Sequence, residues 1–160
     1  MNPKPTIRDE IKQQRPFRSR SAEAAIALLR TASLIHRRAE GVALAEGLSI
    51  QQYNILRILR GAKMPLPTME IAERLIEQAP GITRLVNVLE ERGLIRREQW
   101  AGDRRHVLCQ ITAAGLKLLD KLEGPMNTLD DDTMGNLTDD QLEQLLAMLD
   151  EIRAANRPDT

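Results

Sequence analysis

The 160-residue chain contains one cysteine, three aromatic residues and no net charge. A single cysteine, Cys109, excludes an internal disulfide framework and a cysteine-rich zinc site. Three aromatic side chains are too few to build stacking platforms for single-stranded nucleic acid. No apolar run approaches about 18 residues, and the first residues form no hydrophobic segment. We therefore expect neither a transmembrane span nor a secretory signal, and a cytoplasmic location.

Charge is balanced in total but unevenly distributed along the chain. Residues 1–30 hold seven Lys and Arg against three Asp and Glu, whereas residues 120–151 hold ten Asp and Glu against Lys121 alone. A surface that faces DNA needs only local positive potential, so a neutral total does not exclude nucleic acid. The acidic C-terminal third is expected to lie away from phosphates.

The N-terminal part of the chain is predicted to be an arm followed by two helices. Residues 1–20 carry three prolines among charged and polar residues, which is typical of an extended, flexible arm. Ser21 is expected to cap a long helix that stops at Gly47. Ser49 opens a second helix, which is predicted to end at Gly61.

The pattern that follows is typical of two short helices joined by a tight turn. Thr68 is expected to cap the first of them. The second is predicted to begin at Pro80, because the first helical turn tolerates proline. Apolar residues recur from Ile82 at i, i+3, i+4 and i+7, which is the spacing of one buried helix face. Gly93 closes this helix in the position that favours glycine.

A hairpin and two further helices complete the predicted elements. Residues 94–98 and 106–111 are the strand candidates, and Thr112 is expected to cap the next helix. Pro125 should kink or break that helix, because proline removes a backbone hydrogen bond. Thr138 opens a last helix with a capping box. One apolar stripe runs along it: Leu142, Leu145, Leu146, Leu149 and Ile152.

The helix that follows the tight turn carries side chains suited to base recognition. Its wheel places Arg84 and Asn87 nearly opposite the apolar sector, with Thr83 at the flank. Arginine and asparagine read guanine and adenine edges by paired hydrogen bonds in the major groove. On an isolated helix the same residues would simply be a solvated face. The preceding short helix, the turn and the following hairpin favour a DNA-binding helix-turn-helix.

The tip of the hairpin is the second candidate contact with DNA. Arg104 and Arg105 can reach phosphates or a narrow minor groove, where negative potential is enhanced. Asp103 is expected to hold an arginine by a charge-assisted hydrogen bond. Alone, the tip is equally compatible with a solvated turn.

The combination of these segments resembles the MarR family of winged-helix regulators. The segments that carry the resemblance are LSIQQYNIL, ITRLVNVLEERGLIRRE, GDRRH and the IT-AAG stretch that follows the second strand. The similarity runs from about Leu48 to Leu119. It implies a mainly α fold with a small β-wing, a winged helix-turn-helix flanked by N- and C-terminal dimerisation helices. The implied segments are an arm at 1–20, a first dimerisation helix at 21–47, a DNA-binding lobe at 48–112, C-terminal dimerisation helices at 113–155 and a tail at 156–160.

The resemblance also implies a function. Members of the family are homodimers that bind double-stranded DNA at pseudo-palindromic promoter sites, usually as repressors. Carried over by position, the groove-reading residues are Thr83, Arg84 and Asn87, and the wing residues are Asp103, Arg104 and Arg105. Many relatives release DNA when a small organic ligand or an oxidant acts near the junction of the two lobes. Here that junction includes the first helix, where Arg37 and Arg38 are candidate partners of an anion.

Other chemistry has weaker support in the sequence. Cys109 is either a partly buried, inert thiol or a redox sensor, but peroxide-sensing relatives keep their reactive cysteine in the first helix. His36 and His106 lack the spacing of a metal site, and the calcium-loop pattern at residues 130–141 lacks two required oxygen ligands. We expect no cofactor, no metal and no enzymatic activity. The alternative function is a winged-helix module that binds protein instead of DNA.

Overall fold

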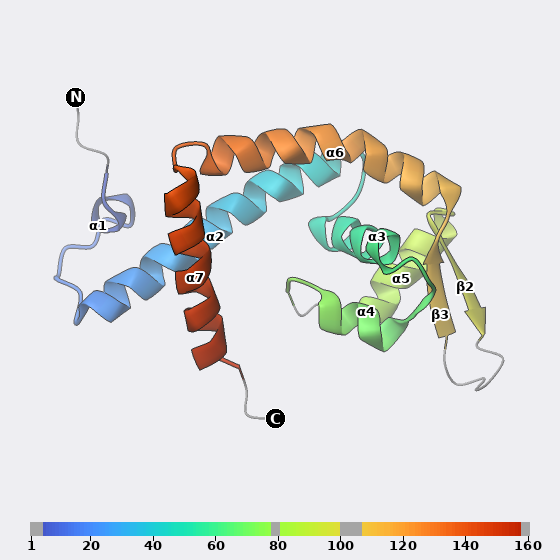
Figure 1. The fold of residues 1–160 in the computed structure, drawn as a ribbon, viewed down its shortest axis with the longest axis horizontal. Helices are drawn as coiled ribbons and strands as arrows, with labels where there is room; N and C mark the ends of the chain where they lie inside the picture. Colours follow the sequence, from blue (N-terminus) through green and yellow to red (C-terminus); the bar gives the residue numbers. More distant parts are fainter. Residues whose placement is uncertain (1–4, 78–80, 100–106, 158–160) are drawn as a thin grey trace. The chain divides into compact units, whose positions relative to one another are not determined.

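The computed structural model describes residues 5–77, 81–99 and 107–157. The chain divides into two compact units, residues 1–50 and 51–160. Among the described residues, no helix is both long enough and apolar enough to cross a membrane. The fold is mainly helical with one small antiparallel sheet, as the sequence predicts (Figure 1).

The N-terminal unit begins with a folded segment. Helix α1 (Ile7–Glu10) occupies the middle of the predicted extended arm, so that prediction is wrong for these residues. Thr6 and Asp9 form a reciprocal capping box around the first turn, in which the backbone amide of Thr6 donates to the Asp9 carboxylate at 2.9 Å. The Glu10 carboxylate lies 3.6 Å from the Arg30 guanidinium on the next helix. Local capping and this ion pair therefore give the segment a defined shape.

The long N-terminal helix starts slightly earlier than predicted. Helix α2 (Arg20–Ala45) is capped by Ser19, whose hydroxyl accepts a hydrogen bond from a first-turn amide, and not by Ser21. At the other end, Gly47 takes the left-handed conformation at φ 71° and donates to the Leu44 carbonyl at 2.9 Å. The predicted stop at this glycine is confirmed.

Helix α3 (Ile50–Ala62) begins at the predicted place and ends later than predicted. A carboxylate oxygen of Glu40 accepts the Ile50 amide at 2.7 Å, so α2 supplies an acceptor for the first helical N–H. Gly61 lies inside the last turn, and Lys63 takes the left-handed conformation, at φ 58°. The buried residues of the helix are Asn54, Ile55, Leu56 and Leu59.

The sheet contains three strands, of which the sequence predicted two. Strands β2 (Ile95–Gln99) and β3 (Val107–Ile111) form the expected hairpin, within one residue of the predicted bounds. Strand β1 (Leu66–Pro67) pairs with β3 on its other side, with Leu66 opposite Cys109. All pairings are antiparallel and the order is β1-β3-β2. The sheet therefore ties the chain before the helix-turn-helix to the hairpin after it.

The first short helix is not capped by the residue that the sequence suggested. Helix α4 (Thr68–Arg74) has Pro67 at its N-cap position, and Thr68 is its first residue. The Thr68 hydroxyl instead lies 3.7 Å from the Cys109 sulfur, a hydrogen-bond contact across to β3. The Thr68 prediction is wrong because this side chain contacts the sheet.

The second short helix is closed at both ends by left-handed glycines. Helix α5 (Ile82–Glu91) begins after Gly81, whose φ of 95° cannot belong to a helix, so the predicted start at Pro80 is wrong by two residues. Pro80 itself lies outside the described residues. At the C-terminal end, Gly93 has φ 67° and stops the helix as predicted. Figure 1 shows α4 and α5 beside the β2–β3 hairpin.

The following helix continues through a proline. Helix α6 (Ala113–Met134) contains Pro125, which was predicted to kink or break it, yet the helix continues for nine residues beyond the proline. Pro125 is exposed, whereas Met126 and Leu129 are buried on the other face. Burial of two such side chains contributes about 3–6 kcal/mol, which offsets the roughly 3 kcal/mol that an interior proline costs.

The last helix is built as the sequence predicts and carries exposed apolar residues. Helix α7 (Asp139–Ala155) opens with the predicted capping box, in which the Thr138 amide donates to the Gln141 side chain at 2.9 Å. None of its residues is buried, and Leu146 and Ile152 are 60% and 45% exposed. An apolar stripe left exposed in this way favours contact with a partner.

Helices α5 and α6 and the sheet meet in one close contact. The Thr112 hydroxyl donates to the Gly93 carbonyl at 2.7 Å and accepts from the Gly115 amide at 3.2 Å. The Thr112 amide donates to the Leu94 carbonyl at 3.0 Å. A Cβ atom on Gly115 would lie 2.3 Å from that same carbonyl oxygen and 2.7 Å from Ile111. The T-x-x-G sequence therefore lets the start of α6 approach the chain that links α5 to β2.

We predict that Gly115→Ala destabilises the protein by about 1–3 kcal/mol, because the added methyl group must displace a backbone carbonyl. The matched control is Gly41→Ala in the interior of α2, where a Cβ meets nothing within 4 Å and no proline follows. That change should stabilise the protein by roughly 0.5–1 kcal/mol, since alanine favours helix. Urea unfolding followed by circular dichroism measures both. Equal stability of the two variants would contradict the close contact.

Candidate nucleic-acid interface

Helix α5 presents a buried face and an exposed polar face. Val86 and Leu89 are buried, with 1% and 0% of their surface exposed. The predicted groove-reading residues lie on the other side: Thr83 and Arg84 are exposed and Asn87 is half-buried. Thr83 and Arg84 fall in the first turn, and Asn87 follows one turn later. The structure thus brings these three together at the N-terminal half of one short helix.

The predicted wing residues Asp103, Arg104 and Arg105 lie outside the described residues. The two strands that lead to them are described. On β2, the Arg96 guanidinium donates to the side-chain oxygen of its cross-strand partner Gln110 at 2.6 and 3.1 Å. This pair fastens the two strands of the wing on one face of the sheet.

An ion pair on the opposite face joins the wing to α5. Arg97 Nε donates to a Glu90 carboxylate oxygen at 2.7 Å, and Arg97 Nη2 contacts the same oxygen. The hydrogen bond from Arg97 holds the pKa of the Glu90 carboxyl below its usual value. The pair therefore contributes stability above the ordinary pKa of glutamate and is lost only as pH falls through the lowered value. It is intact at neutral pH.

Sequence reasoning missed this pair, although both residues belong to the L-E-x-R-G-L-I-x-R stretch. Glu90 and Arg97 are seven residues apart and lie on a helix and a strand. The helical spacing rule pairs residues within one helix, and strand alternation relates residues within one strand. Neither rule therefore predicts a contact between Glu90 and Arg97. The signal that could have found them is Gly93, because a left-handed glycine between helix and strand folds the two segments back together.

The cysteine lies in the core of the sheet. Cys109 has no exposed surface, and burial raises the pKa of its thiol, against a smaller opposite effect of the contact with Thr68. A thiol of raised pKa stays protonated at neutral pH, and the protonated form is not the nucleophile. Of the two interpretations of Cys109, burial favours the inert thiol.

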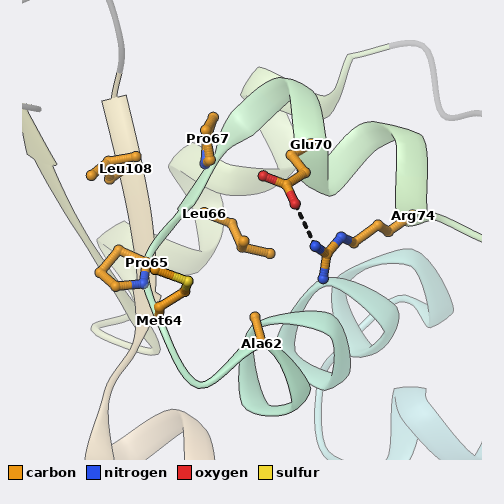
Figure 2. Close-up of a pocket in the computed structure, with 8 residues that line it drawn as sticks. All are labelled: Ala62, Met64, Pro65, Leu66, Pro67, Glu70, Arg74 and Leu108. Atoms are coloured by element: carbon orange, nitrogen blue, oxygen red, sulfur yellow. Dashed lines mark hydrogen bonds and ion pairs between the residues drawn. The ribbon is translucent and has the colours of Figure 1, made fainter. Parts of the chain in front are cut away.

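A hollow of about 510 Å³ opens beside α4, and no residue of α5 lines it. Figure 2 shows apolar side chains on one side of it and the Glu70–Arg74 ion pair of α4 on the other. Its lining residues are Ala62, Met64, Pro65, Leu66, Pro67, Glu70, Arg74 and Leu108. Among the described residues, no group of three His, Cys, Asp or Glu side chains is placed to hold a metal ion.

Comparisons with known proteins agree on one family. The model of the MarR family matches residues 46–106. A MarR transcription factor from Planctomyces limnophilus is 38% identical, over 84% of this chain and 98% of that one, with a TM-score of 0.65. The chain belongs to the MarR family. It is a DNA-binding transcription regulator with a winged-helix fold, as the resemblance implied.

More distant structures share the fold. MepR of Staphylococcus aureus, solved as a complex with DNA, is 23% identical over 81% of this chain and 96% of that one, with a TM-score of 0.73. BpsR of Bordetella bronchiseptica, whose DNA binding is regulated by 6-hydroxynicotinic acid, is 19% identical over 82% and 98%, with a TM-score of 0.71. The helix-turn-helix and wing of this chain thus have the architecture of regulators that bind DNA.

Proposed function

We propose that the protein is a homodimeric repressor that binds a pseudo-palindromic promoter site through α5 and the wing. The observation that carries this proposal is the polar face of α5, where Thr83, Arg84 and Asn87 lie opposite the buried Val86 and Leu89. The buried face fixes the helix on the domain, so the polar face is free to enter a major groove. Two copies related by a two-fold axis read two half-sites.

The alternative is a module that binds protein through the same face. Such a face typically offers large aromatic or aliphatic anchors. Between residues 82 and 91, no large apolar side chain is exposed. This composition favours DNA as the partner of α5.

Dimerisation through the terminal helices is supported by their exposed apolar surface. On α2, Leu29 and Leu44 are 70% and 57% exposed, and on α7 Leu146 is 60% exposed. A stripe of this kind favours burial against a second copy.

Control by a small organic acid completes the proposal. The hollow beside α4 combines apolar walls with Arg74, whose ion pair with Glu70 lies on the helix surface. An exposed pair of this spacing is worth only about 0.3–0.5 kcal/mol, so a ligand carboxylate can replace Glu70 at little cost. Because the walls belong to α4 and the sheet, a bound ligand acts on the elements that hold α5.

We predict that Arg84→Ala weakens binding to the operator by about 1–3 kcal/mol and relaxes the base preference at one position of each half-site. Arg105→Ala should instead weaken binding to many sequences and flatten the salt dependence, since a wing arginine contacts phosphate. Fluorescence anisotropy with operator and scrambled duplexes at several salt concentrations separates the two effects. Identical behaviour of both variants on both duplexes would contradict the assignment of base reading to α5.

For the dimer, Leu146→Glu should shift the protein to monomer while leaving each chain folded, because this side chain is largely exposed within one chain. Gln144→Glu places the same charge on the opposite side of α7 and is the matched control. Sedimentation velocity measures the oligomeric state. A Leu146→Glu variant that remains a dimer would show that α7 does not form the interface.

For effector control, salicylate titrated into a preformed complex should weaken operator binding about 5–150-fold, the usual range of such coupling. Salicylamide, which lacks the carboxylate, is the control, and Arg74→Gln should abolish the response. If no compound in a panel of aromatic acids weakens binding, control by organic acids is excluded. Release that persists in Arg74→Gln would place the ligand elsewhere.

A further inference from the structure

The Glu90–Arg97 ion pair lies where it controls the direction of the groove-reading face. Glu90 belongs to the last turn of α5, one turn after Asn87, and Arg97 is the middle residue of β2. Only the tight turn through Gly93 separates the two elements in the chain. A contact between their side chains therefore limits rotation of α5 about its own axis relative to the wing.

The position of Arg97 in the sheet explains why this contact is specific. Side chains alternate between the two faces of a strand, so Arg97 shares the face of the buried Ile95, whereas Arg96 points the other way, to Gln110. Across the ladder, Arg97 is paired with the buried Cys109. An arginine on this inner face needs a polar partner at the edge of the core. Glu90 is that partner, because one of its carboxylate oxygens accepts a hydrogen bond from Arg97 Nε and contacts Arg97 Nη2.

Backbone hydrogen bonds hold the end of α5 at the turn, and the ion pair adds a tie farther from the turn. The Gly93 amide donates to the Glu90 carbonyl at 2.8 Å and the Leu94 amide to the Leu89 carbonyl at 2.9 Å, which closes the helix end. The Thr112 hydroxyl then fixes the Gly93 carbonyl. All of these bonds lie at the turn itself. The ion pair is the tie that reaches from the flank of the helix to the middle of the strand.

We infer that Glu90 and Arg97 are positioning residues for DNA reading, which set the orientation of Arg84 and Asn87 relative to the wing. The inference rests on the proposed function, because it concerns how α5 meets the operator. A carboxylate on the proposed DNA-reading helix is repelled by phosphates, so Glu90 does not add affinity through its charge. The inference explains its presence by the ion pair that it forms with Arg97.

The sign of the Glu90→Gln effect tests the inference. If only charge matters, loss of a carboxylate on α5 strengthens binding to every duplex, since repulsion from phosphates is reduced. If the pair positions α5, operator binding weakens. Loss of a partly exposed ion pair should lower operator affinity about threefold per protomer. The two protomers of a dimer together should therefore lose about tenfold in operator affinity. Affinity for scrambled duplex should stay equal or rise, so the ratio of operator to scrambled affinity falls.

The matched control is Glu91→Gln, which removes the same charge at the next, exposed position of α5. It should leave the affinity ratio unchanged. The double exchange of Glu90→Arg with Arg97→Glu rebuilds the pair with reversed charges and should recover much of the lost ratio. Thermal unfolding of all variants, and the NMR signal of the Arg97 Nε–H, report folding and the ion pair independently of DNA.

A changed Arg97 Nε–H signal shows that Glu90→Gln has broken the ion pair. The inference is overturned if such a variant binds the operator as tightly as the wild type, or more tightly. It is equally overturned if Glu91→Gln lowers the ratio to the same degree. Wild-type protein that binds operator and scrambled duplexes equally would overturn the proposed function itself, and the inference with it. A reduced ratio in Glu90→Gln, restored by the double exchange, is the result we expect.

Discussion

The close contact at Thr112 is the constraint on which the rest of the DNA-binding unit depends. One hydroxyl joins the carbonyl of Gly93 to the amide of Gly115, and so connects α5, β3 and α6. The absence of a side chain at Gly115 permits α6 to start against the Leu94 carbonyl. Without this approach, the start of α6 could not lie against the turn that joins α5 to β2.

Rigidity at one end of α5 matters for the proposed function because the proposed base-reading residues lie at the other end. Thr83 and Arg84 are in the first turn, whereas the ties at Glu90 and Gly93 hold the last turn and the residue just beyond it. A small rotation at the fixed end is carried along the helix to the side chains that we propose to meet base edges. Base contacts are directional, whereas phosphate contacts tolerate displacement. The ties therefore bear on specificity more than on affinity for DNA in general.

Much of this architecture could be predicted from the sequence. Two of the three predicted glycine stops, Gly47 and Gly93, were correct, because glycine readily takes the positive φ that ends a helix, whereas Gly61 lies inside α3. The Thr138 capping box was also correct, because its hydrogen bonds join residues only three positions apart. Two of the wrong predictions have tertiary causes. Thr68 bonds to the sheet instead of capping its helix, and α6 continues through Pro125 because burial on its other face outweighs the missing hydrogen bond.

The site was predicted less completely than the fold. The periodicity of α5 gave the exposed polar face, since the helix wheel depends only on spacing. The ties that hold this face depend on distances between a helix and a strand, and no sequence period encodes them. The third strand was missed because two residues that include a proline have no strand pattern of their own. The sequence pattern supplied the candidate base-reading residues, and the structure adds the contacts that hold their helix.

Selection of bound sites from a random duplex library with purified full-length protein tests the central claim most directly. The account predicts enrichment of one sequence with two-fold symmetry, whose half-site centres lie about one helical turn, roughly 10–10.5 base pairs, apart. The Arg84→Ala protein should select the same spacing with one position per half-site relaxed. Enrichment of a single unpaired half-site, or of no sequence at all, would contradict recognition of DNA by a symmetric dimer through α5.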